Sequence, residues 1–399
     1  MSDRPYPART DPLPWKLADV TPRWLTGLLR NRYPGIEIAD FEIVENKNSH
    51  TTKLRLRLAL NDVGVAAGIP ERVCLKSNWS GLRTGEICER EARFYHLVST
   101  THRDRFAGAV PHAYYADWDG AGAGNGVVMM EDLGESPGAF GSSSDHLGVD
   151  GVAAGLESLA VLHGALWGSP ATDAPWLAQS MDTENDTEQV IQFWNYIWFN
   201  LTDPDYEQAV PRWVYEHPEL MNQALDELSA YERERPGPKS LVHGDAHQGN
   251  SFLRRNGERV WLDWQLVRAG SPWRDVCYFI VGGLTVDERR SADRDLVEHY
   301  RDRLVATGAQ GVPAADGAWQ QFIRWPAYGT QAWLGNINQW GQRSGLEMVR
   351  RQFCASDDYD TVGLLTNGKL PRRPFVPGEG ALRLAPDLQR QLDERLAAR

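Results

Sequence analysis

The sequence predicts an α+β protein in which a strand-rich part, the first lobe, is followed by a longer, mostly helical part, the second lobe. Three observations lead to this prediction. Before residue 131, apolar and polar residues alternate in several short segments, which is the period of strands. After it, apolar residues recur every three or four positions in longer segments, which is the period of helices. A chain of 399 residues is also long enough to form two hydrophobic cores.

Composition limits the classes of function. The chain is 42% hydrophobic and 24% charged, as is typical of soluble globular proteins. A net charge of −12 without a basic tail indicates that nucleic acid is not a partner. Solubility accounts for this acidity, and attraction of a cationic substrate is the alternative. We expect no signal peptide, because the N-terminal residues have no apolar core, and no membrane segment, because no apolar run approaches about 18 residues. The four cysteines lie far apart, which predicts free thiols in the cytoplasm.

The first lobe is expected to contain five strands and two helices. Its first helix should begin at Thr21-Pro22, because threonine caps a helix and proline fits the first helical position. A second helix is expected over residues 85–99. A polar turn over residues 45–52, between the first two strands, contains no glycine. The strands are expected at residues 36–44, 53–60, 72–76, 110–117 and 127–131.

The second lobe is expected to begin with a glycine- and serine-rich link over residues 136–144. His163 should be a hydrogen-bonded core residue rather than a ligand. The chain has 16 tryptophans, which fit either a tryptophan-rich core or a pocket for a flat polycyclic acceptor such as a steroid. Helices are expected at residues 149–167, 286–307 and 315–350, the last of them kinked at Pro326.

The most informative stretch is His243-Gly244-Asp245, which is followed by Asn250 and, thirteen residues after that, by Asp263. Asp245 and Asn250 are close enough in sequence for a tight loop to present both side chains to one place. One carboxylate could orient a hydroxyl, while an amide and a second carboxylate could hold a hard cation. Oxygen ligands with open positions suit Mg²⁺. Phosphoryl transfer requires the same parts.

The pattern His-Gly-Asp-x-x-x-x-Asn, followed by Asp-Trp-Gln, resembles the aminoglycoside phosphotransferase and choline kinase group. The glutamine of the second motif, Gln265, is similar to the ecdysteroid-kinase-like branch. This resemblance implies a protein-kinase-like fold, with a small five-stranded antiparallel lobe over residues 1–131 and a larger, mostly helical lobe over residues 132–399. It also implies that Asp245 is the catalytic base and that Asn250 and Asp263 hold Mg²⁺. ATP or GTP would then donate a phosphoryl group to a hydroxyl of a small-molecule acceptor.

The same resemblance implies a set of nucleotide-binding residues. Lys76 would be oriented onto the phosphates by an ion pair with Glu91, for which Glu89 is the rival partner. Asp275 would support the catalytic loop by hydrogen bonding. The other implied residues are the turn residues Asn48 and Ser49, the backbone of Glu131 and Leu133 at the adenine, and Trp264 and Gln265 beside the phosphates.

Two other functions fit the sequence. The glycine-free turn would suit a protein that binds a nucleotide without catalysis. Alternatively, His243, Asp245 and His247 would share one face of an extended strand and could bind zinc in a hydrolase, although the glycines nearby favour a loop. For a kinase, the acceptor stays open among aminoglycosides, choline-like amines, sugars, amino acids and steroids.

Overall fold

The protein is represented by a computed structural model and forms two compact units. Unit 1 comprises residues 1–140 and 251–267, and unit 2 comprises residues 141–250 and 268–399. The expected lobe boundary at residue 131 stays a prediction. The segment 251–267 belongs with unit 1, although in sequence it follows helices of unit 2. The structure describes residues 13–48, 51–79, 87–106, 108–119, 124–179, 197–235, 237–335, 342–367, 369 and 386–398.

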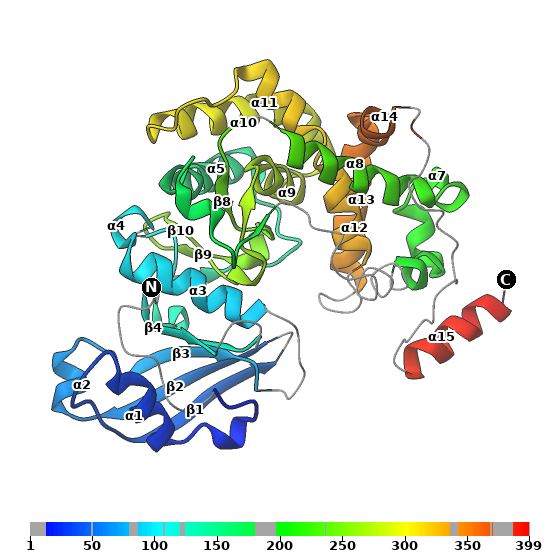
Figure 1. Ribbon diagram of the computed structural model, residues 1–399. Coiled ribbons are helices and arrows are strands. Elements are labelled where there is room, and N and C mark those ends of the chain that lie inside the picture. Colours follow the sequence, from blue (N-terminus) through cyan, green and yellow to red (C-terminus); the bar gives the residue numbers. More distant parts are fainter. Residues whose placement is uncertain are drawn as a thin grey trace. The chain divides into compact units, whose positions relative to one another are not determined.

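Unit 1 contains a five-stranded sheet in the order β1-β2-β3-β5-β4 (Figure 1). All neighbouring strands are antiparallel, so the expected α+β class with a five-stranded antiparallel sheet is confirmed. The strands are β1 (Ile38–Asn48), β2 (Thr52–Leu60), β3 (Arg72–Ser77), β4 (Ala113–Trp118) and β5 (Gly126–Glu131). The helices of unit 1 are α1 (Pro22–Arg30), α2 (Asp62–Ala66), α3 (Ile87–Thr100) and α4 (Arg103–Phe106).

The two faces of β2 show why the sheet forms from this sequence. Leu54, Leu56 and Leu58 of β2 are buried in one core with the leucines of α1, and Thr21 caps α1 as expected, accepting the N–H of Trp24. Three cations alternate with these leucines and therefore share the opposite face of the strand, because side chains alternate between its two faces. The cationic face carries Lys53, Arg55 and Arg57.

Close packing of β5 against α3 depends on Gly126. A Cβ atom there would lie 2.3 Å from the carbonyl oxygen of Cys88 and 2.8 Å from the Cβ of Ala92, both in α3. We therefore expect Gly126→Ala to displace α3 and to lower the free energy of unfolding by about 1–3 kcal/mol, measured in urea.

Gly27→Ala is the matched control for this variant. Gly27 lies in α1, where an added Cβ would meet nothing within 4 Å. The control should stabilise the protein by about 0.5–1 kcal/mol, because alanine favours a helix over glycine. Equal effects of the two variants would contradict the close approach of α3 to β5.

A small second sheet in unit 1 has the order β10-β9-β6, with strands β6 (Gly138–Phe140), β9 (Ser251–Arg254) and β10 (Arg259–Trp261). Part of the glycine- and serine-rich link expected over residues 136–144 is therefore a strand. A Cβ at Gly138 would lie 2.5 Å from the carbonyl oxygen of Leu253, so glycine here permits close pairing with β9.

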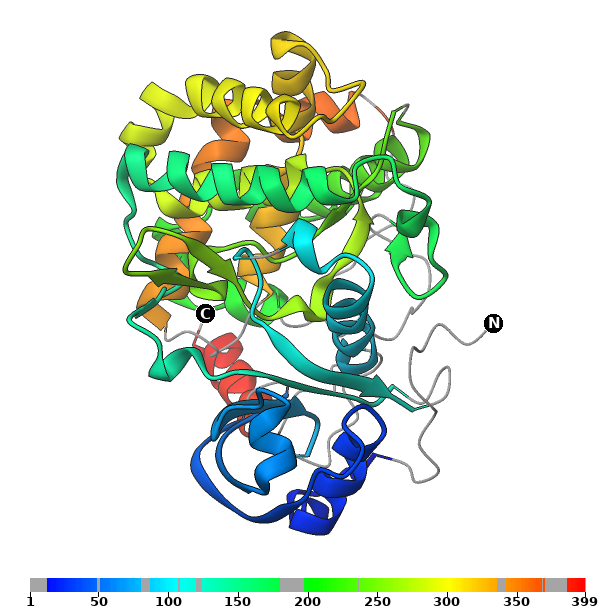
Figure 2. The ribbon, with the colours of Figure 1, turned by 90° about the vertical axis from the view of Figure 1, so that its left-hand side faces the viewer.

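Unit 2 is organised around α9 (Trp273–Gly283), all of whose residues are buried. Figure 1 and Figure 2 show α5 and α10 running side by side, and both helices also contact α9. The expectation of one kinked helix over residues 315–350 was wrong, because the chain forms separate helices there. Pro326 begins α12 rather than kinking a longer helix, because proline fits a first helical position.

The other helices in the described part of unit 2 are α5 (Gly148–Ala165), α7 (Arg212–Glu216), α8 (Glu219–Glu234), α10 (Val286–Ala306), α11 (Ala315–Phe322), α12 (Pro326–Leu334), α13 (Gln342–Asp358), α14 (Thr361–Thr366) and α15 (Pro386–Ala397). Three short strands, β7 (Ala178–Gln179), β8 (Ser240–Val242) and β11 (Arg268–Gly270), form a third sheet. None of the helices in the described part of the chain combines the length and apolar character that crossing a membrane requires. All four cysteines are free thiols, as expected.

Candidate active site

Lys76 lies near the end of β3, and its side chain is only 4% exposed. Its Nζ atom lies 2.7 Å from Oε2 of Glu91 on α3 and 2.8 Å from Oδ1 of Asp263. The expected Lys76–Glu91 ion pair is therefore present. The rival, Glu89, instead pairs with Arg93 one helical turn away.

The Asp263 carboxylate accepts hydrogen bonds from two lysines. Oδ1 accepts from Lys76, and Oδ2 accepts from Lys53 on β2, each at 2.8 Å. Burial alone would raise the pKa of Asp263, but the two ammonium groups outweigh it and hold this pKa well below its usual value. Burial opposes the charge of Lys76, yet Asp263 and Glu91 raise its pKa above the usual value. Asp263 and Lys76 are therefore both charged at neutral pH.

Trp264 and Gln265, which complete the Asp-Trp-Gln motif, make contacts inside unit 1. The Trp264 ring is fully buried and stacks on Phe94, with ring centroids 4.0 Å apart. This burial argues against the expectation that the ring lies beside the phosphates. The backbone N–H of Trp264 donates to Oε1 of Glu91, and Nε2 of Gln265 donates to Oγ1 of Thr51 at 2.9 Å. Gln265 thereby ties the motif to the polar turn between β1 and β2.

Asn48 is the last residue of β1 and lies opposite Thr52 on β2, at the start of the polar turn. Ser49 lies outside the described residues. Asn48 is exposed, so its side chain is available to a ligand of the turn. Phosphate binding by Asn48 and Ser49 stays a prediction.

Glu131 and Leu133 follow one another at the end of β5. The N–H of Glu131 donates to the carbonyl of His112, and its carboxylate accepts from Nη2 of Arg254 at 2.9 Å. Leu133 is buried against Phe252 and Val260. Binding of adenine by the backbone of Glu131 and Leu133 stays a prediction.

The loop that carries Asp245 follows β8 in unit 2, and Asp275 of α9 anchors it. The Asp275 carboxylate accepts the backbone N–H groups of His243 at 2.6 Å and Gly244 at 2.9 Å, as expected for a supporting residue. It also pairs with Nε2 of His163 at 3.1 Å, and Nδ1 of His163 bonds Tyr300. His163 is thus the hydrogen-bonded core residue that the sequence predicts.

A second set of contacts fixes the same loop from its other side. The carbonyl of Gly244 accepts hydrogen bonds from the Arg274 guanidinium and from the Tyr328 hydroxyl. Gly244 itself has a φ of 85°, a left-handed conformation that glycine adopts without steric cost. The loop before Asp245 is therefore held by both its N–H and its C=O groups.

Asn250 holds Asp245 directly. Its Nδ2 atom donates to Oδ2 of Asp245 at 2.9 Å and to the Asp245 carbonyl at 3.0 Å. Because the amide nitrogen is directed at Asp245, the Oδ1 atom of Asn250 is the acceptor left to bind a cation. The Asp245 side chain is 29% exposed, so a ligand can reach it.

The two histidines of the zinc alternative have other contacts. Nδ1 of His243 accepts the N–H of Asp245, and Nδ1 of His247 accepts that of Gly249. The His247 ring also packs edge-on against Trp333. Among the residues that the structure describes, no group of three or more His, Cys, Asp or Glu side chains could hold a metal ion. The described residues thus give the zinc hydrolase no support.

Sequence reasoning missed three residues of these clusters, Lys53, Arg274 and Tyr328. A signal existed for Lys53, which starts the run of alternating cations in β2, next to the strand of Lys76. For Tyr328, no signal linked a residue of α12 to the carbonyl of Gly244, 84 positions earlier.

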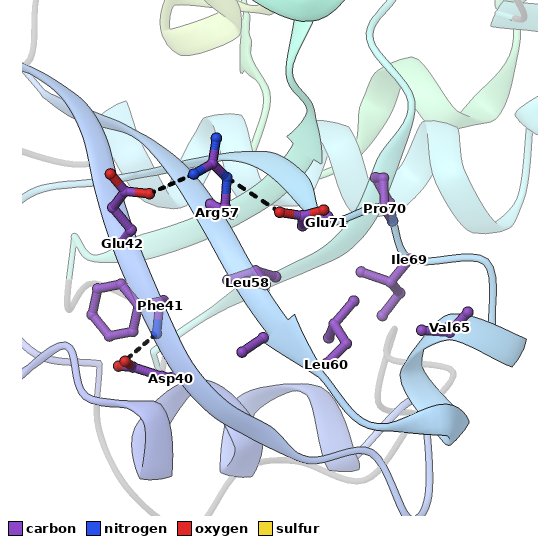
Figure 3. Close-up of a pocket in the computed structure, with 11 residues that line it drawn as sticks. Asp40, Phe41, Glu42, Arg57, Leu58, Leu60, Val65, Ile69, Pro70 and Glu71 are labelled. Atoms are coloured by element: carbon purple, nitrogen blue, oxygen red, sulfur yellow. Dashed lines mark hydrogen bonds and ion pairs between the residues drawn. The ribbon is translucent and has the colours of Figure 1, made fainter.

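A pocket of about 710 Å³ lies towards the other end of β1 and β2 (Figure 3). Arg57 pairs with Glu42 and Glu71 in its wall, and Asp40 and apolar residues such as Leu60 and Ile69 line it as well. None of the predicted site residues lines this pocket.

Comparisons with solved structures found several kinases. Spectinomycin phosphotransferase, solved with ADP and spectinomycin, is 11% identical, with 86% of this chain and 98% of that chain covered and a TM-score of 0.49. A microcompartment-associated aminopropanol kinase is 15% identical, with 81% and 94% covered and a TM-score of 0.48. Choline kinase from Cryptosporidium parvum is 11% identical, with 88% and 98% covered and a TM-score of 0.47. A search of curated proteins found no significant match.

The family comparison is more specific. The model of the ecdysteroid kinase-like family matches residues 76–310, which is more than half of the chain. The matched range contains Lys76, Glu91, Asp245, Asn250 and Asp263. The resemblance carried by the His-Gly-Asp and Asp-Trp-Gln motifs is thereby confirmed, and the chain belongs to the ecdysteroid kinase-like family.

Proposed function

We propose that this protein is a small-molecule kinase that transfers the γ-phosphoryl group of ATP to a hydroxyl of its acceptor. The observation that carries the proposal is the buried Lys76, fixed by Glu91 and by Asp263 of the Asp-Trp-Gln motif. A lysine fixed and charged in this way is suited to bind the phosphates of a nucleotide.

Asp245 orients the acceptor hydroxyl and takes its proton. The carboxylate is partly exposed, and the hydrogen bonds from Asn250 restrict its position. Asp275, Arg274 and Tyr328 fix the preceding backbone, which supports a carboxylate that is held before the acceptor binds. Positioning of this kind is most of what catalysis of phosphoryl transfer requires.

Asn250 and Asp263 would hold Mg²⁺, which neutralises charge on the phosphates when it is bound. The donors fit this ion, because the Oδ1 atom of Asn250 and the Asp263 carboxylate are hard oxygen ligands. The charge of Asp263 also fits, since its carboxylate already pairs with the ammonium groups of Lys53 and Lys76.

The nucleotide would be bound by residues of unit 1. Lys76 would contact its phosphates, with Asn48 and Ser49 as further donors from the turn. Gln265 would act through Thr51, whose hydroxyl it holds. The backbone of Glu131 and Leu133 would bind the base of ATP, with GTP as the alternative donor.

A phosphorylation screen tests the proposed function. The purified protein is incubated with MgATP and a panel of hydroxyl compounds, led by ecdysteroids and other steroids because of the family, and including amino alcohols, aminoglycosides, sugars and amino acids. ADP release that depends on one acceptor, together with that acceptor gaining one phosphoryl group by mass spectrometry, is the expected result. Tight binding of MgATP without turnover across the panel would instead favour a nucleotide-binding protein without catalysis.

A further inference from the structure

Three lysines form a row across neighbouring strands of unit 1. Lys47 of β1 lies opposite Lys53 of β2, and Lys53 lies opposite Lys76 of β3. Side chains that lie opposite one another on antiparallel strands project from the same face of the sheet. The row therefore gathers three positive charges beside the polar turn between β1 and β2. Like charges in this arrangement destabilise a sheet unless anions offset them.

Three carboxylates supply the offset. Glu45 pairs with Lys47 at 3.0 Å, Asp263 pairs with both Lys53 and Lys76, and Glu91 pairs with Lys76 again. The exposed fraction of the lysine side chains falls along the row, from 70% for Lys47 to 35% for Lys53 and 4% for Lys76. Lys76 is thus fixed in place, whereas Lys53 is anchored at its tip and still reaches solvent.

Two kinds of cation compete for the Asp263 carboxylate. It is the proposed ligand of a metal ion, yet both of its oxygens accept from lysines. A metal ion at Asp263 would compete with one of these contacts. Lys76 is buried and also held by Glu91, so the contact more easily lost is that of Lys53, which among the described residues pairs with Asp263 alone. The released ammonium group, on its flexible stem, then requires another anion.

We propose that Lys53 is a second phosphate-binding lysine, held by Asp263 in the free protein and transferred to the terminal phosphates of the bound nucleotide. This inference rests on the proposed function and adds a residue to it. It also accounts for the turn over residues 45–52, which has no glycine to bring backbone N–H groups close to a phosphate. In this chain the strand lysine takes over that contact.

The test compares Lys53→Met with Lys53→Arg and with a matched control, Arg57→Met. Arg57 is a cation on the same strand and face, 46% exposed, and paired with Glu42 and Glu71 (Figure 3). The dissociation constants of MgATP and AMP are measured by calorimetry at one ionic strength. Lys53→Met should weaken the binding of MgATP about 10- to 100-fold. It should weaken the binding of AMP by less than about twofold, because AMP lacks the terminal phosphates. Lys53→Arg should restore most of the MgATP affinity, and Arg57→Met should change neither constant.

Binding of Mn²⁺ without nucleotide gives a second readout. Lys53→Met should tighten it several-fold, because Asp263 loses a competing cation. Weaker nucleotide binding together with tighter metal binding would not result from a variant that is merely misfolded, since misfolding would weaken both. Unchanged or weaker Mn²⁺ binding would overturn the release of Lys53 from Asp263.

The outcomes separate this inference from the proposed function. Two results would overturn the role of Lys53 while the unmodified protein still binds MgATP and the kinase proposal stands. In the first, Lys53→Met binds MgATP as tightly as the unmodified protein does. In the second, Lys53→Met loses affinity for AMP and for MgATP to the same extent. If the unmodified protein binds no MgATP, both are overturned.

Discussion

Replacing Asp245 with asparagine is expected to lower kcat about 100- to 10,000-fold while changing the affinity for MgATP by less than about twofold. The variant keeps the size of the side chain, but it removes the charge that orients the acceptor hydroxyl. The residues proposed to bind the nucleotide phosphates, Lys76 and Lys53, are not altered. The measurement is steady-state turnover with the best acceptor, together with calorimetry of MgATP binding.

Asp287→Asn is the control for Asp245→Asn. Asp287 is on α10, also in unit 2, and its side chain is 96% exposed. It should leave kcat unchanged, and both variants should unfold thermally within a few degrees of the unmodified protein. If Asp245→Asn kept full turnover, the carboxylate would have no part in the reaction, and the proposed mechanism would be wrong.

Replacing Asp275 with alanine is expected to lower the free energy of unfolding by about 3–5 kcal/mol, or to prevent folding. The Asp275 carboxylate is fully buried and accepts from the N–H groups of His243 and Gly244 and from His163. Its loss would leave three donors buried without an acceptor. Urea unfolding measures the effect, and Asp287→Ala, on the surface, should cost less than about 0.5 kcal/mol.

If the Asp275→Ala variant fails to fold, the dependence of stability on pH still tests the stabilising role of Asp275. Burial alone would raise the pKa of Asp275, but the hydrogen bond and charge of His163, with His243 and Arg274, hold it below its usual value. A carboxyl whose pKa is lower in the folded state stabilises the protein above its unfolded pKa, and this contribution is lost as the pH falls through the folded pKa. Acidification should therefore reduce the stability of the unmodified protein more steeply than that of Asp275→Asn. Parallel profiles of the two proteins, with equal stability at neutral pH, would contradict this role.

The strands and the expected ion pair could be predicted from the sequence because each leaves a local pattern. β2 alternates leucines with cations, since one face lies on a core and the other does not. Lys76 and Glu91 are only 15 positions apart, and family motifs mark both. The support of the loop by Asp275 was also anticipated.

Contacts between distant parts of the chain could not be predicted in this way. Lys53 and Asp263 are 210 positions apart, and nothing in either segment indicates the other. Likewise, the glycine-rich segment of β6 becomes a strand because β9 offers it hydrogen bonds, not because of its own residues. Trp264 was placed beside the phosphates from its position in a motif, but its ring fills the space against Phe94.

The backbone of Asp263 limits how its role can be examined by mutation. Its φ of 63° and ψ of 62° are left-handed, a region that glycine, asparagine and aspartate enter more readily than other residues. Alanine at this position would add conformational strain to the loss of the carboxylate, so an alanine scan would confuse a damaged turn with a missing ligand. Asparagine removes the charge with little strain. Of the three residues that suit this turn, aspartate alone carries a negative charge, so chain geometry and cation binding favour the same amino acid.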